Sequence, residues 1–232
     1  YKRLLQASTA LLTIFTITSI PAPTLADDAV FPDTHRYEGA DGSDGGDGDN
    51  GSGGDDSSPF DYVFTYTAPD INSTADETHG ISVQLAGGDG GDGEGAGLFD
   101  DAGKGGPGGS GGNITATVGD LSGTLEVVTS GSRSHGVFLL SEGGNGGDGG
   151  GQDEGDIGGD AGEGRQGGNA GNIVLEVFGS VVLETYGDAA HGLFVKSVGG
   201  DGGDGGDADN FFSADGGDGG DGGASGALVQ AV

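Results

Sequence analysis

The stretch His191-Gly192-Leu193-Phe194-Val195 decides the fold, because the chain carries two earlier versions of it. They are His135-Gly136-Val137-Phe138-Leu139 and His79-Gly80-Ile81-Ser82-Val83, and the three copies follow one another at intervals of 56 residues. Self-similarity at a fixed period of this size is typical of repeat architectures. We therefore expect stacked structural units that share one continuous core, rather than an ordinary compact globular domain.

Each unit contains three short runs with the composition of β-strands. In the clearest unit they cover about 172–178, 180–186 and 191–198, are rich in Val, Ile, Leu and Thr, and are separated by Gly or Asp. Side chains on a strand alternate between its two faces, so positions that are always aliphatic belong inside. The expected inward columns are Ile81, Val83, Val137, Leu139, Leu193 and Val195, followed by Ile173, Leu175 and Val177, and by Val181 and Leu183. Coils stacked at about 4.8 Å would bury these columns, and the fold class is all-β, a parallel β-helix-like solenoid over residues 60–232.

Long Gly-rich segments lie between the strand groups, at about 39–58, 87–112, 142–171 and 199–226. Because glycine loses the most backbone entropy on ordering, we expect them to be disordered, mobile loops, with 27–59 as a Gly/Asp-rich linker. Several carry acids at every third position, as at Asp201, Asp204 and Asp207. Packed polyglycine-II helices are an alternative, which the interruptions at Leu98-Phe99 and Phe211-Phe212 disfavour.

Composition excludes several classes of protein. The chain has 232 residues with 58 Gly, 6 Pro and no Cys, which excludes collagen, a disulfide scaffold and a thiolate metal site. It has 38 acidic against 7 basic residues, a formal net charge of −31. Such a polyanion repels nucleic acid and anionic lipid and attracts cations. We expect no nucleic-acid partner.

The N-terminal segment has the order of an export signal. Lys2 and Arg3 precede an apolar stretch over 10–20, and Pro21-Ala22-Pro23-Thr24-Leu25-Ala26 then leads into acidic residues. We interpret residues 1–26 as a signal peptide, which places the remainder outside the cytoplasm. The chain starts at Tyr and contains no Met. We therefore expect an N-terminal fragment whose repeats are truncated at the C-terminus.

Two sets of side chains recur with the period. A ladder formed by His79, His135 and His191 suggests zinc, but each precedes Gly at the start of a strand, where packing or hydrogen bonding at the turn is favoured. Asp92, Asp148 and Asp204 follow the histidines by thirteen residues. In a polyproline-II-like segment, acids at every third residue lie about 9 Å apart, which is too far for neighbouring acids to bind one calcium ion. We therefore favour solvated acidic chains over weak binding of Ca²⁺ or other cations. We assign no catalytic, cofactor-binding or metal-binding residue and expect no cofactor.

Residues 187–200 resemble the passenger repeat of Gram-negative autotransporters. The phrase G-x-x-A-x-G-I-x-A-x-S-I-G-G of that family is matched by Ala190, Gly192, Leu193, Ser197, Val198, Gly199 and Gly200, with Val195 in place of Ala. The copy at 131–144 has Glu142 where an aliphatic residue belongs, and the copy at 75–88 has Leu85 in place of Ser. The resemblance implies a secreted β-helical passenger at the cell surface or outer membrane, delivered by a C-terminal barrel that is not present in this fragment.

Two classes of function remain. The first is a structural or adhesin-like surface protein, a stiff spacer with acidic loops, whose partner is an unknown surface ligand or another copy. The second is a polysaccharide-acting enzyme on a parallel β-helix, and a Ca²⁺-binding Gly-rich repeat protein is a further alternative. An enzyme interrupts its repeat at the site, whereas a spacer keeps repeating. Since every unit has the same loop in the same place, we favour the spacer and expect no enzymatic activity.

Overall fold

The computed structural model describes residues 33–46, 48–58, 61–67, 70–97, 100–119, 121, 123–152, 159–208 and 215–231. The expected signal peptide, residues 1–26, lies outside this range, as do Leu98-Phe99 and Phe211-Phe212. The described part is all-β and contains no helix, and hence none long and apolar enough to cross a membrane.

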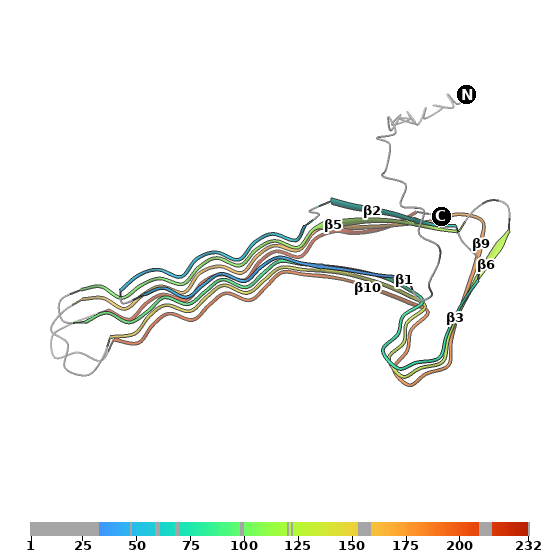
Figure 1. Ribbon diagram of the computed structural model, residues 1–232. Helices are drawn as coiled ribbons and strands as arrows, with labels where there is room; N and C mark the ends of the chain where they lie inside the picture. Colours follow the sequence, from blue (N-terminus) through green and yellow to red (C-terminus); the bar gives the residue numbers. More distant parts are fainter. Residues whose placement is uncertain are drawn as a thin grey trace, which may run out of the picture.

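Eleven strands form three sheets, and every pairing between them is parallel. Sheet A has the order β1-β4-β7-β10, sheet B β11-β8-β5-β2 and sheet C β3-β6-β9. The strands are β1 Asp33–Glu38, β2 Asp61–Tyr66, β3 Ile71–Ser73, β4 Ile81–Ala86, β5 Asn113–Val118, β6 Thr124–Thr129, β7 Val137–Glu142, β8 Ile173–Val177, β9 Ser180–Thr185, β10 Leu193–Val198 and β11 Leu228–Ala231. The chain visits sheets B, C and A in that order and then repeats, so equivalent strands of successive repeats lie side by side (Figure 1).

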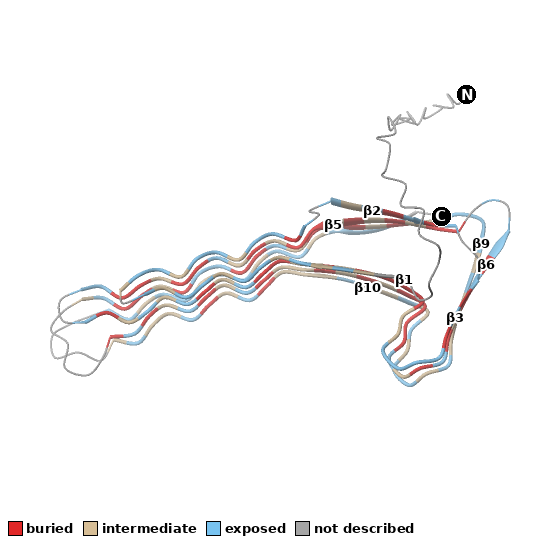
Figure 2. Cartoon of the chain, in the orientation of Figure 1, coloured by how far each residue is buried: buried red, intermediate tan, exposed pale blue. Residues whose placement is uncertain are grey.

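The register confirms the aliphatic columns that the sequence predicts. Ile81 pairs with Val137 and Val137 with Leu193 in sheet A, and Ile173 lies beside Ile114 in sheet B. Buried residues lie on all three sheets (Figure 2). They form one core cluster, which includes Ile71, Ile81, Val83, Ile114, Val127, Leu139 and Ile173. β10 is an edge strand of sheet A, and Leu193 on it is 39% exposed although its counterpart Val137 is buried.

The stack begins earlier than the sequence suggests. Residues 27–59 were expected to form a linker, but β1 lies within this range and pairs along its whole length with β4. Residues 39–46 and 48–56 continue from β1 and bond to the next repeat, for example through the Gly42 amide and the Asp89 carbonyl. The described part of the first layer therefore includes Asp33–Glu38.

The Gly-rich segments are ordered, which corrects the expectation of mobile loops. After each strand of sheet A an outgoing segment leaves the sheets, and a returning segment leads back to sheet B (Figure 1). We call these segments together the glycine arm; its described parts are 39–46 and 48–58, 87–97 and 100–112, 143–152 and 159–172, and 199–208 and 215–227. Outgoing segments lie beside outgoing segments of the next repeat, and returning beside returning, so the arm has two layers.

Hydrogen bonds within the arm recur at every third residue, as they would in packed helices of the polyproline II type. The amides of Gly87, Gly90 and Gly93 all donate to the next repeat, Gly87 to the last residue of β7 and the other two to the outgoing segment that follows it. A second set alternates between the two layers and forms an unbroken chain of N–H···O bonds through the whole stack. It runs from Gly220 through Gly203, Arg165, Gly147, Gly106, Gly91 and Ser52 to Ser43. The described segments thus bond with the period of three that packed polyglycine-II helices would have, although the interruptions in the sequence disfavour that arrangement.

Close approach of the backbones explains the glycine content. A Cβ atom built on Gly147 would overlap the Gly91 carbonyl oxygen, and one built on Gly106 would overlap the Ser52 carbonyl oxygen. Each such contact lies where two segments bond through their amides. The entropy lost by ordering glycine is therefore offset by backbone hydrogen bonds that a larger residue would prevent.

A serine joins the arm to the sheets in two repeats. The Ser141 hydroxyl, fully buried, donates to the Gly112 carbonyl at 2.9 Å and accepts the Gly171 amide at 2.8 Å. Ser197 repeats this bridge with the Gly171 carbonyl and the Gly226 amide. The equivalent residue of the first copy is Leu85, which is buried in the core instead. The Ser of the autotransporter-like phrase therefore holds the outgoing and returning segments together where the core ends.

Candidate functional site

Three histidines lie next to one another at the turn that leads into sheet A; His79 and His135 are stacked, and His191 is tilted by 47° against His135. The turn has the same shape in each repeat, because Glu77, Arg133 and Ala189 occupy equivalent positions and all have φ between 54° and 55°. Two residues further on, His79, His135 and His191 lie one above another, with ring centroids 5.0 and 5.1 Å apart. The 56-residue period thus brings together the histidines that the sequence singles out.

Phenylalanine rings extend this stack along sheet A. Phe138 lies 4.3 Å from the His79 ring at an interplanar angle of 6°, and Phe194 lies 4.9 Å from His135 at 15°. The two phenylalanines stack on each other at 5.0 Å. We call these five side chains, His79, His135, His191, Phe138 and Phe194, the aromatic column. His135, at its centre, is only 7% exposed.

Hydrogen bonds fix the imidazoles in one state. The backbone amide of His135 donates to Nδ1 of His79 at 3.2 Å, and the amide of His191 donates to Nδ1 of His135 at 3.1 Å. An Nδ1 atom that accepts a hydrogen bond carries no proton, so both rings are neutral with their hydrogen on Nε2. The expectation that the histidines pack and hydrogen-bond at the turn is confirmed by these contacts.

The surroundings of the column favour the neutral imidazole. Burial, with a smaller contribution from the neighbouring His135, lowers the pKa of His79 from 6.5 to about 4, although Glu77 acts in the opposite direction. Burial and His191 lower the pKa of His135 as well. The Nδ1 atoms of His79 and His135 are each engaged by a backbone amide, so these two nitrogens are not presented to zinc. Among the described residues no group of three or more His, Asp or Glu side chains is placed to hold a metal ion.

The acids of the arm form ladders of their own. Oδ1 of Asp92 accepts the Asp148 amide at 2.9 Å, and Oδ1 of Asp148 accepts the Asp204 amide at 2.7 Å. In the neighbouring row Asn145 takes the place of an acid, and its Oδ1 accepts the amide of Asp201. The Asp or Asn side chain at every third position thus accepts the backbone N–H of the equivalent residue in the next repeat, which has no carbonyl partner among the described residues of either layer. Asp92 and Asp148 are exposed, as expected of solvated acids, but one carboxylate oxygen of each is bound to an amide of the next repeat.

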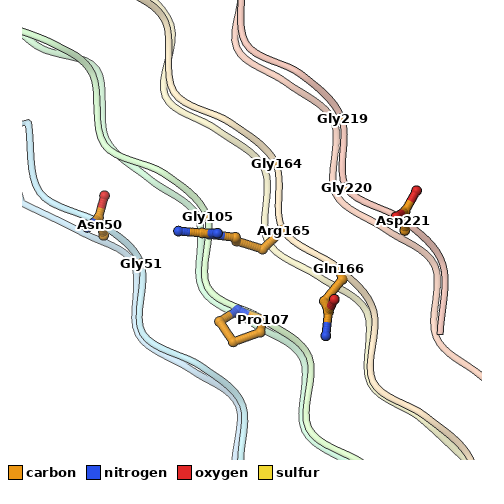
Figure 3. Close-up of a pocket in the computed structure, with 10 residues that line it drawn as sticks. All are labelled: Asn50, Gly51, Gly105, Pro107, Gly164, Arg165, Gln166, Gly219, Gly220 and Asp221. Carbon is orange, nitrogen blue, oxygen red and sulfur yellow. The ribbon is translucent and has the colours of Figure 1, made fainter.

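A shallow depression crosses the returning layer at one point of the arm. Its floor is formed mainly by glycines of four successive segments, and Asn50, Pro107, Gln166 and Asp221 stand around it (Figure 3). Arg165 occupies a place that Gly106 and Gly220 hold in the neighbouring repeats, and its exposed side chain extends toward the segment of Gly105. Nearby, Lys104 bonds to Glu163 at 2.9 Å and holds the pKa of that carboxyl below its ordinary value.

The other candidates lie apart from these features. His35 is on β1 and contacts the rings of Tyr62 and Phe64, so it does not join the column. Two triplets, Asn72-Ser73-Thr74 and Asn113-Ile114-Thr115, match the pattern of a glycosylation site. Asn72 is exposed on β3, whereas Asn113 donates to Asp61 and accepts the Asn172 amide as part of a ladder. The sequence signal for these ladders was Asp or Asn at matching positions of successive repeats.

Comparison with known proteins gives one structural similarity. No family model matches the chain, and no curated protein matches it. A solved structure, the springtail antifreeze protein from Granisotoma rainieri, is described as a bundle of nine polyproline type II helices whose crystal waters match the ice lattice. It is 22% identical, with 82% of this chain and 94% of that chain covered, at a TM-score of 0.19. A TM-score this low establishes neither a common fold nor a common function.

Proposed function

We propose that this chain is a structural, adhesin-like part of a secreted or cell-surface protein, built as a β-solenoid in which each 56-residue repeat is one coil. The observation that carries the proposal is the unbroken register. Val137 pairs with Ile81 on one side and Leu193 on the other, and sheets B and C continue their pairing across the same repeats. A spacer needs this regularity, whereas an active site requires a local departure from it.

The two layers of the glycine arm support the same proposal. An arm held by hydrogen bonds through every repeat is a stiff plate rather than a loose brush. Its outer rows carry Asp and Asn at fixed positions, for example Asp92, Asp148 and Asp204. With a formal charge of −31, such a plate stays hydrated and attracts cations. We propose that it keeps neighbouring molecules apart or presents a surface to a ligand.

The export signal and the autotransporter-like phrase support a location outside the cytoplasm. We propose that residues 1–26 direct secretion and that the repeats are displayed at the surface of a Gram-negative cell. A fusion of residues 1–60 to a reporter enzyme that is active only in the periplasm tests the first step. We expect activity that disappears when residues 10–20 are deleted, and cytoplasmic retention of the intact fusion would refute the assignment.

Insertion of extra repeats tests the spacer directly. Ten further copies of residues 137–192, placed between Gly192 and Leu193, preserve the pattern at every junction. If each copy adds one coil, the molecule becomes a ribbon of constant width that is about 48 Å longer, at about 4.8 Å per coil. Electron microscopy of the purified proteins measures both dimensions. Separate beads, or a contour that does not lengthen with the number of copies, would contradict the proposal.

A further inference from the structure

The hydrogen bonds of the aromatic column join successive repeats through groups that can take up a proton. The amides of His135 and His191 each have an imidazole Nδ1 of the preceding repeat as acceptor, at 3.2 and 3.1 Å. A proton on Nδ1 would turn the acceptor into a donor and leave two N–H groups facing each other. Rows that use Asn or Asp at the equivalent inter-repeat position, such as Asn145 beneath Asp201, keep an acceptor oxygen instead.

Protonation would also place positive charges close together. The rings of His79 and His135 are stacked at 5.0 Å with an interplanar angle of 10°, and His135 is almost fully enclosed. Phe138 and Phe194 cover the rings and add no counter-charge. A cation over a phenyl ring gains some attraction, but this attraction does not restore the lost acceptor.

Few charged groups act on the column. Those of the same turns are Asp76, Glu77, Arg133 and Asp188, and Glu77 is paired with Arg133. On sheet A the side chains beside the rings are Ser82, Phe138 and Phe194, which are uncharged. The electrostatic influences on His79 come from His135 and Glu77, and that on His135 comes from His191. The carboxylate that acts on His79 is thus already paired with Arg133.

We propose that the aromatic column is an acid-sensitive clasp between repeats, which holds while the imidazoles are neutral and opens when His79 and His135 are protonated. Opening removes the bonds from the His135 and His191 amides and loosens those from Gly80 to the His135 carbonyl and from Gly136 to the His191 carbonyl. The sheets and the arm retain their own hydrogen bonds. The expected result is local loosening of the turns, not unfolding of the stack.

The direction of the pH dependence follows from the pKa shifts. The pKa of His79 is about 4 in the folded chain against 6.5 when unfolded, so the folded state binds fewer protons between these values. The contribution of the clasp is complete above pH 6.5 and is lost as the pH falls toward 4. Measurements between pH 7.5 and 5 stay above the ordinary pKa values of carboxyl groups, about 3.9 for Asp and about 4.3 for Glu.

Amide hydrogen exchange of the full chain, corrected for the intrinsic pH dependence of exchange, tests the clasp. We expect protection at the amides of His135, Gly136 and His191 to fall at least about tenfold between pH 7.5 and 5, while Gly147 in the arm changes little. The double variant His79→Asn/His135→Asn replaces each Nδ1 by an amide oxygen that does not titrate, so its protection should not fall. The matched control His35→Asn alters a histidine outside the column and should behave as the parent chain does.

A direct titration keeps the test decisive if the double variant does not fold. The imidazole proton resonances of the parent chain report the pKa of each histidine, and we expect those of His79 and His135 to lie below 6.5. Values at or above 6.5 would overturn the proposal, because attraction to the phenyl rings or to Glu77 would then outweigh burial. Equal loss of protection in the double variant and the His35→Asn control would overturn it as well.

Discussion

The packing of the glycine arm predicts that a Gly→Ala substitution has different effects on stability at two equivalent positions of different repeats. Gly105 and Gly219 occupy equivalent positions of the returning layer, with Gly164 between them, because the Gly105 amide bonds to Glu163 and the Gly164 amide to Asp218. A Cβ on Gly105 would overlap the Gly147 carbonyl oxygen, whereas a Cβ on Gly219 would lie 3.5 Å from its nearest neighbour, the Gly203 oxygen. Neither residue has a positive φ that would itself disfavour alanine.

The cost at Gly105 can be estimated from the bonds at risk. To admit a methyl group, the Gly147 peptide must move away. It donates to the Gly106 carbonyl at 2.8 Å and accepts the Arg165 amide at 3.0 Å. Breaking one bond and leaving its groups buried costs about 1–3 kcal/mol, so losing both costs about 2–6 kcal/mol, while alanine gains about 0.4–1 kcal/mol by restricting the unfolded chain. We therefore expect Gly105→Ala to lower the free energy of unfolding by about 3 kcal/mol, and Gly219→Ala to leave it unchanged or slightly raised.

Thermal unfolding followed by circular dichroism measures the difference. For a chain of this size a change of 1 kcal/mol shifts Tm by about 2–4 °C, so Gly105→Ala should unfold about 6–12 °C below the parent chain. Gly219→Ala serves as the matched control. Equal shifts for the two variants, or a Gly105→Ala variant as stable as the parent, would refute the close packing of the two layers.

Three further predictions concern the ladders, the junction and the turn. Asp148→Asn keeps the acceptor for the Asp204 amide and removes the repulsion between Asp148 and the neighbouring acids, so it should raise the free energy of unfolding by up to about 1 kcal/mol at low salt and by less in 0.5 M NaCl. Asp148→Ala removes the acceptor and should lower the free energy of unfolding by about 1 kcal/mol. If urea titrations show Asp148→Ala to be more stable than Asp148→Asn, the ladder is contradicted. Ser141→Ala leaves the Gly112 carbonyl and the Gly171 amide unpaired and should cost about 2–4 kcal/mol, more than Ser197→Ala at the less buried end of the stack, as thermal melts of the pair can show. Ala189 has a φ of 54°, which glycine adopts without strain, so Ala189→Gly should leave the free energy of unfolding unchanged or raise it by up to about 1 kcal/mol. Ala190→Gly, at the next residue, should lower it. Thermal melts in which Ala190→Gly is the more stable variant would rule out a strained turn.

The sheets could be predicted because the residue type at individual positions shows which side chains face the core. The aliphatic pair two and four residues after each histidine marks both the period and the inward face, and Ile81, Val137 and Leu193 do pair as that pattern requires. The same period predicts that the histidines stack. The direction of the amides toward Nδ1 depends on the shape of the turn, which the residue types alone do not reveal.

The arm could not be predicted from the cost of ordering glycine, because its stability is collective. A single Gly-Gly-Asp triplet such as 90–92 has no partner of its own and would remain flexible. Order arises when segments from successive repeats align, so that Gly91 can donate to Ser52 while Gly106 donates to Gly91. The available signal was the recurrence of Asp and Asn at matching positions, as at Asp92, Asp148 and Asp204. Those acids were interpreted as solvated because a sequence does not show which oxygen meets which amide.

Holding two layers together mostly through peptide groups also sets how the chain responds to temperature. Unfolding the arm exposes polar backbone and little hydrocarbon, and polar surface lowers the heat capacity of unfolding, whereas hydrocarbon raises it. The heat capacity change of the whole chain should therefore fall below the usual value of about 12–15 cal/mol/K per residue. Its free energy of unfolding then varies only gently with temperature, and the arm stays ordered in the cold, where contacts between aliphatic side chains weaken.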